Sequence, residues 1–346
     1  QGMNWPQLLA PLLLGAAALF GWWVGSKAQA RKAVRWLWAG ICVALVLVSM
    51  AVLARLPASA GEWQAGGDEL SEALAAASHE DVMLVDLLPF GDHLGHTTSL
   101  MDRYKAAPVY WGWARQEPVS AERQAVLSAL GAVHQRLWLV LDTTPEADPA
   151  STTERWLDEH AFRVASGWLS PAMRLVEYAW PPGDAGQKVP LDLRLGPDLR
   201  LEAFAPACSK SPDNSEAESC TPQVPLRVQS GDVLPFTLSW RANRAVQEDY
   251  MVFVQLLDEE GALHAQLDRR PVGGFRPTST WQPGEEIADN YGLRLPSELI
   301  PGRYLLIAGL YLPASLDRLE VTAGDGVFLG DHAFLGEVIV VEGNGP

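Results

Sequence analysis

Two uncharged apolar runs near the start of the chain constrain its fold more than any other feature. They cover residues 5–24 and 36–54, and the segment between them, 26–35, reads SKAQARKAVR with four basic residues. At about 1.5 Å per helical residue, each run is long enough to cross a hydrocarbon core of about 30 Å. We therefore expect two transmembrane helices within residues 1–57. A signal peptide followed by one anchor fits less well, because no basic segment precedes the first run and no small-residue cleavage site follows it.

The basic segment 26–35 predicts the orientation of these two helices. Short loops rich in Lys and Arg stay in the cytoplasm, so the N-terminus and everything after residue 57 are expected outside it. Five of the 26 basic residues and none of the 42 acidic residues lie in 1–57. The remainder is therefore strongly acidic, which repels nucleic acid and anionic lipid head groups. We expect no nucleic-acid partner.

Two cysteines support the expectation that the part of the chain after residue 57 lies in an oxidising compartment. Cys208 and Cys220 bracket the polar loop CSKSPDNSEAESC. Two cysteines that close a short loop outside the cytoplasm favour a disulfide. Zinc is the alternative, but no histidine or second cysteine pair stands nearby at ligand spacing. We expect the disulfide and no metal.

Residues 58–182 alternate between helical and strand patterns. Ser120 can cap a helix at 121–135, and Ser151 with Glu154 forms a capping box ahead of a second helix. Nearly continuous apolar strands are expected at 82–88, 136–142 and 173–180. Apolar strands between amphipathic helices are typical of a parallel sheet covered on both faces. The pattern predicts a small, Rossmann-like α/β domain.

After the Pro/Gly-rich linker 181–190, the helical periodicity disappears. The segment VLPFTLSW alternates apolar and polar residues, and DEEG at 258–261 is typical of a hairpin turn with Gly261 at its left-handed position. Further alternating segments follow at spacings typical of two packed sheets. Residues 183–346 are therefore expected to form an Ig-like or jelly-roll-like β-sandwich.

One candidate ligand site lies in the loop GDHLGHTT, where Asp92, His93 and His96 follow the first expected strand. The end of a parallel strand is a common place for ligand contacts. Three such residues without a further partner are a weak metal signal, and a solvated loop is the simpler interpretation. The usual serine, metalloprotease and phosphate-loop motifs are missing from the sequence, so no catalytic residue is assigned.

A second candidate site is aromatic and lies in the sandwich. It combines rings with neighbouring carboxylates and amides: Tyr250, Trp281, Tyr291 and Tyr311 beside Asp249, Gln255, Asp289 and Asn290. Flat apolar rings with polar neighbours suit a sugar, whose C–H face packs on the ring while its hydroxyls form hydrogen bonds. The alternative is that these rings fill the core of the sandwich.

Several sequence blocks, in this order, resemble the C-terminal region of polytopic glycosyltransferases of the GT-C superfamily. They are GEWQAGGDELSEALAAASHEDVMLVD, KAAPVYWGW, RLWLVLD and RWLDEHAFRVASGW, followed by the sandwich segments from DYMVFVQLLDEEG to PGRYLLIAGLY. The blocks are similar to dolichyl-phosphate-mannose-type protein mannosyltransferases and to bacterial aminoarabinose-transferase-like enzymes. The resemblance implies sugar transfer from a polyprenyl-phosphate donor to a glycan or protein acceptor. It also implies a bacterial cytoplasmic membrane, with the lipid bilayer and other membrane helices as partners and the main domains on the extracytoplasmic side.

The sequence departs from that family at the catalytic position. The family's catalytic acidic residue lies in the first extracytoplasmic loop of a large helix bundle, and this chain has no such loop. No catalytic residue and no cofactor are carried over, and we expect the C-terminal portion of a longer transferase. The alternative is a non-catalytic envelope protein: a membrane-anchored scaffold, a carbohydrate-binding protein or a subunit of a larger complex. A hydrolase using His93 and His96 is a third hypothesis.

Overall fold

A computed structural model describes several stretches of the chain. The described residues are 81–86, 109–111, 120–142, 152–170, 173–180, 187–207 and 225–341, and they belong to one compact unit, Gly66–Pro346. Several predictions lie outside these ranges: both apolar runs, the loop with Asp92, His93 and His96, and the pair Cys208 and Cys220.

Strands dominate the described residues, which also contain two α-helices and two short 3-10 turns. The helices are α5 (Ala121–Val133) and α6 (Thr152–His160), and the 3-10 turns are η1 (Pro271–Gly274) and η2 (Thr278–Thr280). The strands up to the sandwich are β1 (Asp81–Asp86), β2 (Val109–Trp111), β3 (Arg136–Asp142), β4 (Phe162–Ser170) and β5 (Met173–Ala179). The sandwich strands are β6 (Val189–Leu195), β7 (Leu199–Pro206), β8 (Leu226–Gln229), β9 (Val233–Ala242), β10 (Met251–Leu257), β11 (Leu263–Arg269), β12 (Glu286–Arg294), β13 (Gly302–Tyr311), β14 (Val321–Ala323), β15 (Phe328–Gly330) and β16 (Ala333–Val341).

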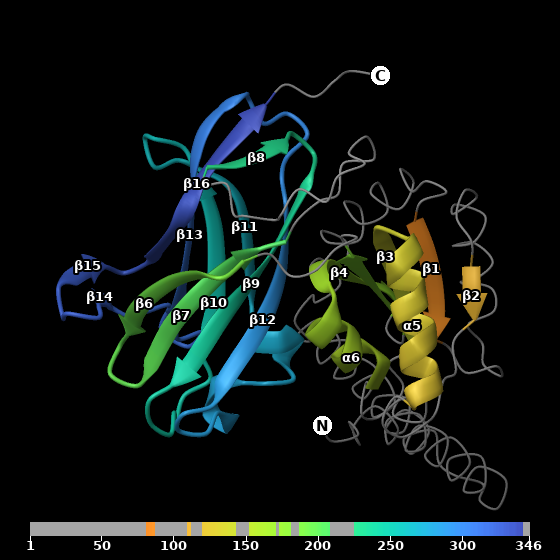
Figure 1. Ribbon diagram of the computed structural model, residues 1–346, viewed down its shortest axis with the longest axis horizontal. Coiled ribbons are helices and arrows are strands. Elements are labelled where there is room, and N and C mark those ends of the chain that lie inside the picture. The colour runs from red at the N-terminus through yellow and green to blue at the C-terminus, as the bar shows by residue number, and fades with distance from the viewer. Residues whose placement is uncertain are drawn as a thin grey trace, which may run out of the picture. The chain divides into compact units, whose positions relative to one another are not determined.

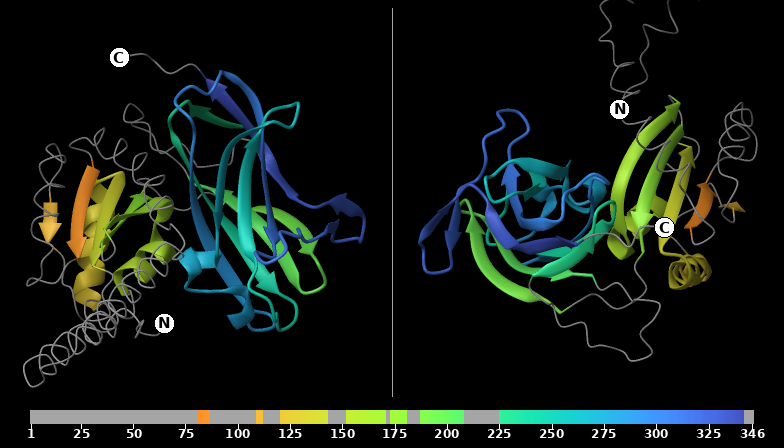
Figure 2. Two further views of the ribbon diagram at one scale, coloured as in Figure 1. Left: turned by 180° about the vertical axis from the view of Figure 1, so that it is seen from behind. Right: turned by 90° about the horizontal axis from the view of Figure 1, so that it is seen from above.

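These strands form two sheets. The larger sheet has 11 strands in the order β15-β14-β6-β7-β9-β12-β4-β5-β3-β1-β2, and the smaller has five in the order β11-β10-β13-β16-β8. The smaller sheet packs face to face with the part of the larger sheet that contains β6, β7, β9 and β12 (Figures 1 and 2). The core between them is the main apolar core of the described structure. Residues from both sheets therefore form the β-sandwich that the alternating pattern predicted.

The alternation along β9 is confirmed in detail. Leu234, Phe236, Leu238 and Trp240 are all at most 4% exposed and belong to the sandwich core. Because successive strand residues point to opposite faces, this period-2 pattern fixes which face of β9 meets the smaller sheet. The hairpin between β10 and β11 is also as predicted, with Gly261 at a φ of +83°, a conformation that glycine adopts at little cost.

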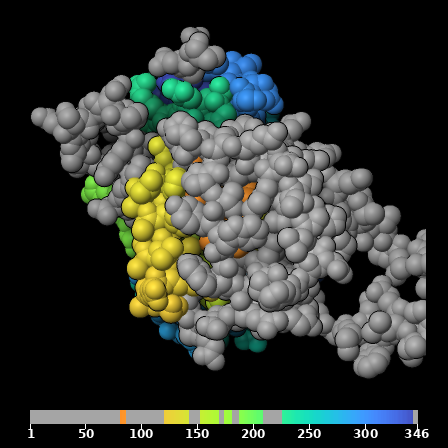
Figure 3. All heavy atoms as spheres, turned by 90° about the vertical axis from the view of Figure 1, so that its right-hand side faces the viewer, coloured from red at the N-terminus to blue at the C-terminus, as the bar shows by residue number. Residues whose placement is uncertain are grey.

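The helix predicted after Ser120 is confirmed, and its cap is visible. The Ser120 hydroxyl accepts a hydrogen bond from the backbone N–H of Arg123 at 3.3 Å, which satisfies one of the free donors of the first helical turn. Leu127 and Leu130 of α5 are buried in a second apolar core shared with β1, β3 and β5. The outer face of the helix lies along the surface of the molecule (Figure 3).

The expected parallel, Rossmann-like sheet is wrong. Strand β1 pairs in parallel with β2 and β3, but β5 pairs antiparallel with both β3 and β4. The sequence pattern missed β4, which follows α6 directly and is joined to β5 by residues 171–172. Such a short connection permits only a hairpin, since a parallel crossover needs a dozen or more residues. The result is a mixed sheet.

The expected fold class as a whole is therefore corrected. The described residues form a predominantly β structure, not a Rossmann-like α/β domain behind two membrane helices. Neither described helix has both the length and the apolar character needed to cross a bilayer. The runs 5–24 and 36–54 lie outside the described residues, so the membrane part of that fold class has no counterpart in the described structure.

The larger sheet continues from the sandwich into the mixed part through β12 and β4. These two strands pair in parallel at Tyr291 and Arg163. Across this junction Asn290 of β12 donates its side-chain N–H to the backbone carbonyl oxygen of Glu159 at 3.1 Å. That carbonyl lies in the last turn of α6, where carbonyls lack helical partners. The boundary near residue 183 stays a prediction, but the sheet itself is continuous.

Candidate functional site

The outer face of the five-stranded sheet, turned away from the sandwich core, carries several exposed or half-buried polar groups together with aromatic rings. Along β10, Val252 and Val254 point into the core, so Phe253 and Gln255 point outward. The register places Phe253 opposite Asp268 of β11 and Gln255 opposite Gln266. Cross-strand partners lie on the same face, so these four side chains share one surface.

Phe253 forms the base of this surface. Its side chain is only 1% exposed although it points away from the core, because the guanidinium carbon of Arg318 lies 4.1 Å from the ring centroid. The Tyr311 ring packs beside it, with centroids 6.3 Å apart. Gly309 lies opposite on β13, where a Cβ atom would come within 2.4 Å of the Phe253 ring. Glycine is therefore required for this close approach.

Hydrogen bonds link the polar groups above Phe253 into a chain from Asp331 through Arg318 and Gln255 to Gln266. The two terminal nitrogens of Arg318 donate to Asp331 Oδ2 at 3.3 Å and to Gln255 Oε1 at 3.4 Å. The Gln255 amide donates to Gln266 Oε1 at 3.4 Å. Because these groups are exposed or half-buried, the same donors and acceptors can form hydrogen bonds with a ligand or with water.

Two further contacts set the electrostatics of the surface. The Tyr311 hydroxyl donates to Asp268 Oδ2 at 3.2 Å, and His332 Nδ1 lies 2.7 Å from Asp331 Oδ1. Burial raises the pKa of Asp268, and burial with the nearby Asp268 carboxyl raises the pKa of Tyr311. The hydrogen bond to His332 lowers the pKa of Asp331, with Arg318 acting in the same direction. Asp331 is therefore firmly ionised beside the Arg318 cation at neutral pH.

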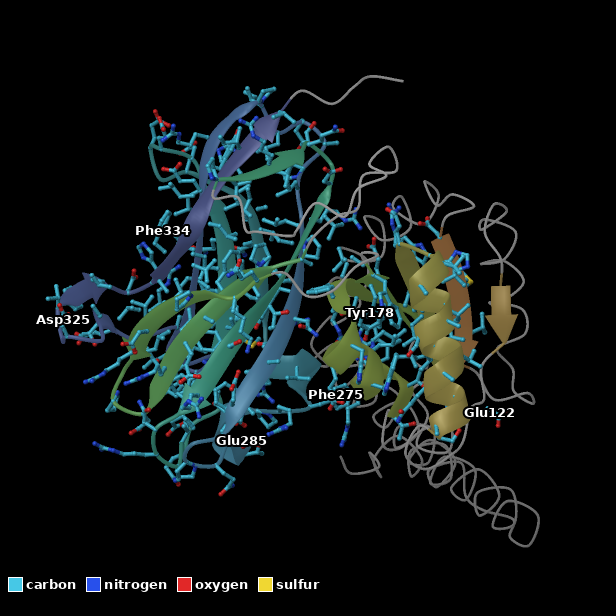
Figure 4. The ribbon with its side chains drawn as sticks, viewed as in Figure 1. Glu122, Tyr178, Phe275, Glu285, Asp325 and Phe334 are labelled. Carbon is cyan, nitrogen blue, oxygen red and sulfur yellow. The ribbon has the colours of Figure 1, made fainter. Side chains whose placement is uncertain are left out.

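Phe334 adds an open aromatic ring to the same face. It lies near the start of β16 (Figure 4) and is 51% exposed, and its cross-strand partner on β13 is the covered Ile307. The β16 backbone fixes where this ring leaves the sheet, so only side-chain rotation is lost when a ligand packs on it. We call the following set the outer-face site: Gln255, Gln266, Asp268, Tyr311, Arg318, Asp331, His332 and Phe334.

The chemistry of the outer-face site suits a polyhydroxy ligand. It offers an aromatic face together with side chains that donate, accept or do both. Among the described residues, no three His, Cys, Asp or Glu side chains are arranged to hold a metal ion. The side chains present favour binding through hydrogen bonds and ring contacts.

Four residues of the aromatic site were chosen from the sequence as ligand-binding, and they do not share an open surface: Tyr250, Trp281, Asp289 and Tyr291. Trp281 is 1% exposed and donates its indole N–H to the Arg276 carbonyl oxygen at 2.8 Å. Tyr250 is half-buried, and its backbone N–H donates to the Thr278 hydroxyl at 2.9 Å. Both contacts organise the loop between β11 and β12.

Asp289 and Tyr291 come together, but inside the protein. Both are 0% exposed, and the Tyr291 hydroxyl donates to Asp289. Arg269 pairs with Asp289 at 3.1 Å, and its guanidinium carbon lies 4.0 Å from the centroid of the Tyr291 ring. Burial raises the pKa of Asp289, and Arg269 opposes that shift. Their role in ligand binding stays a prediction, and so does that of Asp92, His93 and His96.

A separate set of charged residues lies buried near the β12–β4 junction. The junction cluster consists of Glu154, Asp158, Arg163, Arg174 and Tyr178. Arg163 donates to Asp158 Oδ1 at 2.7 Å and to Glu154 Oε1 at 2.5 Å, and Arg174 also pairs with Glu154. Tyr178, labelled in Figure 4, accepts from Arg163 at 3.1 Å. Arg163 and both carboxylates are at most 8% exposed, so this cluster offers no open surface to a ligand.

Sequence reasoning found part of the outer-face site. Tyr311 and Gln255 stood among the aromatic candidates and their polar neighbours, but Phe253, Arg318 and Phe334 did not. The outward position of Phe334 is visible in the alternation of AFLGEVIVV, where Ala333 and Leu335 point into the core. Arg318 lies in a loop, and no local pattern indicates that it packs on Phe253.

Comparisons with known proteins do not identify this chain. No protein-family model and no curated protein sequence matches it. Among solved structures, the crystal structure of the C-terminal domain of Wzt matches with a TM-score of 0.29 and 12% identity, over 45% of this chain and 80% of that chain. A β-glucuronidase from Bacteroides uniformis matches with a TM-score of 0.21 and 11% identity, over 47% of this chain and 17% of that chain. The putative ApaA protein from Bordetella pertussis matches with a TM-score of 0.19 and 14% identity, over 45% of this chain and 98% of that one. These scores are too low to establish a shared fold or function.

Proposed function

We propose that the β-sandwich is a carbohydrate-binding module and that it takes a glycan on the outer-face site. The observation that carries this proposal is the exposed ring of Phe334 on the same sheet face as the hydrogen-bonded groups of Gln255, Gln266, Asp268 and Arg318. An aromatic ring supplies an apolar platform for sugar C–H groups, and the amides, carboxylates and guanidinium supply partners for hydroxyls.

The geometry of Arg318 supports this function over a purely structural role for the face. Its guanidinium is stacked on Phe253 and held by Asp331 and Gln255, so its plane is fixed before a ligand arrives. A fixed fork of donors loses less entropy on binding than a free side chain. Arg318 also remains half-exposed, with 34% of its side chain accessible.

Sugar transfer from a polyprenyl-phosphate donor stays a prediction of the sequence resemblance. The described residues neither test that activity nor contain a residue assigned to it. A carbohydrate-binding sandwich is compatible with a role in transfer and with the alternative of a non-catalytic envelope protein.

The proposal is tested by applying the full 346-residue chain to an array of neutral and acidic bacterial glycans and then measuring affinity by calorimetry. We expect the wild-type chain to retain at least one neutral glycan. Phe334→Ala should weaken its binding about tenfold, because losing an aromatic anchor costs more than ~1 kcal/mol.

A matched control is available on the other sheet. Phe328 of β15 is 62% exposed and belongs to the larger sheet, so Phe328→Ala should leave the affinity unchanged. Retention of no glycan, or an equal loss in both variants, would refute a site on the outer face.

A further inference from the structure

The outer-face site is wider than a single sugar residue. Its groups come from four strands that are adjacent in the order β11-β10-β13-β16. Asp268 and Gln266 lie on β11, Gln255 on β10, Tyr311 on β13 and Phe334 on β16. At a spacing of about 4.8 Å between neighbouring strands, the site spans about 14 Å from β11 to β16. That distance matches a short run of linked sugar residues.

A row of hydrogen bonds also follows this direction. Tyr311 pairs with Asp268 at 3.2 Å, Gln255 with Gln266 at 3.4 Å, and Arg318 with Asp331 at 3.3 Å. Gln266 of β11, Gln255 of β10, Arg318 after β13 and Asp331 just before β16 are thus linked in turn. The Tyr311–Asp268 pair bridges β13 and β11. A site that recognises the end of a chain converges on one residue, whereas polar groups set out in a row can each meet a different residue of one chain.

The charge of the site favours an uncharged ligand. Arg318 is its one permanently positive side chain, and the Asp331 carboxylate already balances its charge. The other titratable groups include the carboxyls of Asp268 and Asp331. The whole chain carries a formal net charge of −16, so a polyanionic glycan would approach against the field of the protein.

From this geometry we infer that the outer-face site binds an internal segment of a linear, uncharged glycan that runs across the strands from β11 to β16. This inference rests on the proposed carbohydrate-binding function and specifies the class of ligand. The ring of Phe334 contacts one residue of the glycan, and the amides of Gln255 and Gln266 contact another.

The length of the ligand is the first test. Calorimetry with the full chain compares mannose, mannotriose and mannohexaose from mannan, and glucose, maltotriose and maltohexaose from amylose. In at least one series we expect the hexasaccharide to bind at least about tenfold more tightly than the monosaccharide, because separate contacts add when one molecule reaches them. A monosaccharide that binds as tightly as its hexasaccharide overturns the inference but leaves carbohydrate binding intact.

Variants at the two ends of the site provide the second test. Phe334→Ala and Gln266→Ala lie at opposite ends, and each should weaken hexasaccharide binding by about fivefold or more. The monosaccharide should respond to only one of the two changes. Equal responses to both ligands overturn the inference.

A hexamer of galacturonate supplies the charge control and should bind about tenfold more weakly than the neutral hexasaccharide. Tighter binding of this polyanion, or binding of neither neutral series, overturns the inference. If the glycan array retains no glycan at all, the proposed function itself fails, so the two failures are distinguishable.

Discussion

The junction cluster makes a quantitative prediction about Arg163. In the folded protein this guanidinium meets the carboxylates of Asp158 and Glu154, whose side chains are 0% and 4% exposed. Arg163→Met keeps an unbranched apolar stem of similar reach but removes the positive charge. Two buried carboxylates would then face each other with only Arg174 as a charged partner for Glu154.

The expected cost follows from the burial of these charges. Removing one partner of a buried ion pair costs about 3–5 kcal/mol, because the remaining charge is neither solvated nor paired. For a unit of this size, that loss lowers the midpoint of thermal unfolding by about 10 °C. Protonation removes the unpaired charge, so the destabilisation of the variant should shrink as the pH is lowered.

Urea and thermal unfolding followed by circular dichroism, at neutral and at acidic pH, measure both effects. Arg200→Met is a matched control, since Arg200 pairs with Asp192 at 3.0 Å on the surface, with side chains 30% and 63% exposed. Exposed pairs contribute about 0–1 kcal/mol. If Arg163→Met costs no more than Arg200→Met, or if its cost does not depend on pH, then burial of charge does not determine the stability of the junction.

Two further predictions concern the packing and the pH dependence of the sandwich. Gly309→Ala should destabilise the protein by about 1–3 kcal/mol in urea unfolding, because the new Cβ would lie 2.4 Å from the Phe253 ring. An unchanged unfolding midpoint would contradict this, since it would mean that the Phe253 ring moves aside at no cost. The hydrogen bond from Arg241 lowers the pKa of Glu202, so this pairing stabilises the fold above the carboxyl's ordinary pKa and stops doing so as the pH falls through its lowered value. Glu202→Gln should therefore be less stable than wild type near neutral pH and equal to it in strong acid, and a difference that persists in acid would contradict this assignment.

Local patterns in the sequence predicted individual elements of the sandwich well. The alternation along β9 identified four core residues, and the DEEG turn placed Gly261 in its left-handed conformation. The same kind of reasoning identified Ser120 as the cap of α5. These features depend on contacts within a few residues or on one face of one strand, which is why sequence spacing reveals them.

Pairing between distant strands was not predictable in the same way. The segment that forms β4 carries no clear alternation, and its antiparallel pairing with β5 makes the sheet mixed. Its second neighbour is β12, more than a hundred residues later in the chain. No local pattern encodes such a partner, because the pairing joins segments that are far apart in the sequence.

The residues of the candidate site show the same difference between what local sequence patterns predict and what tertiary packing determines. The sequence placed aromatic rings beside carboxylates and amides in the sandwich, and Trp281 and Tyr291, but not Tyr311, were among the residues chosen from it as ligand-binding. Only the packing of the two sheets determined that Trp281 and Tyr291 face the core while Tyr311 shares the outer face with Phe253 and Arg318.

The sequence by itself determined that residues after 183 alternate as strands of a sandwich and which face of β9 is apolar. The tertiary structure decided that the mixed part joins the sandwich in one sheet, and that charges from α6, β4 and β5 meet in a buried cluster at that junction. It also decided that Arg318 closes over Phe253. The physical reason is that periodicity reports only whether a residue meets water or protein, whereas the identity of its neighbour depends on how distant segments pack.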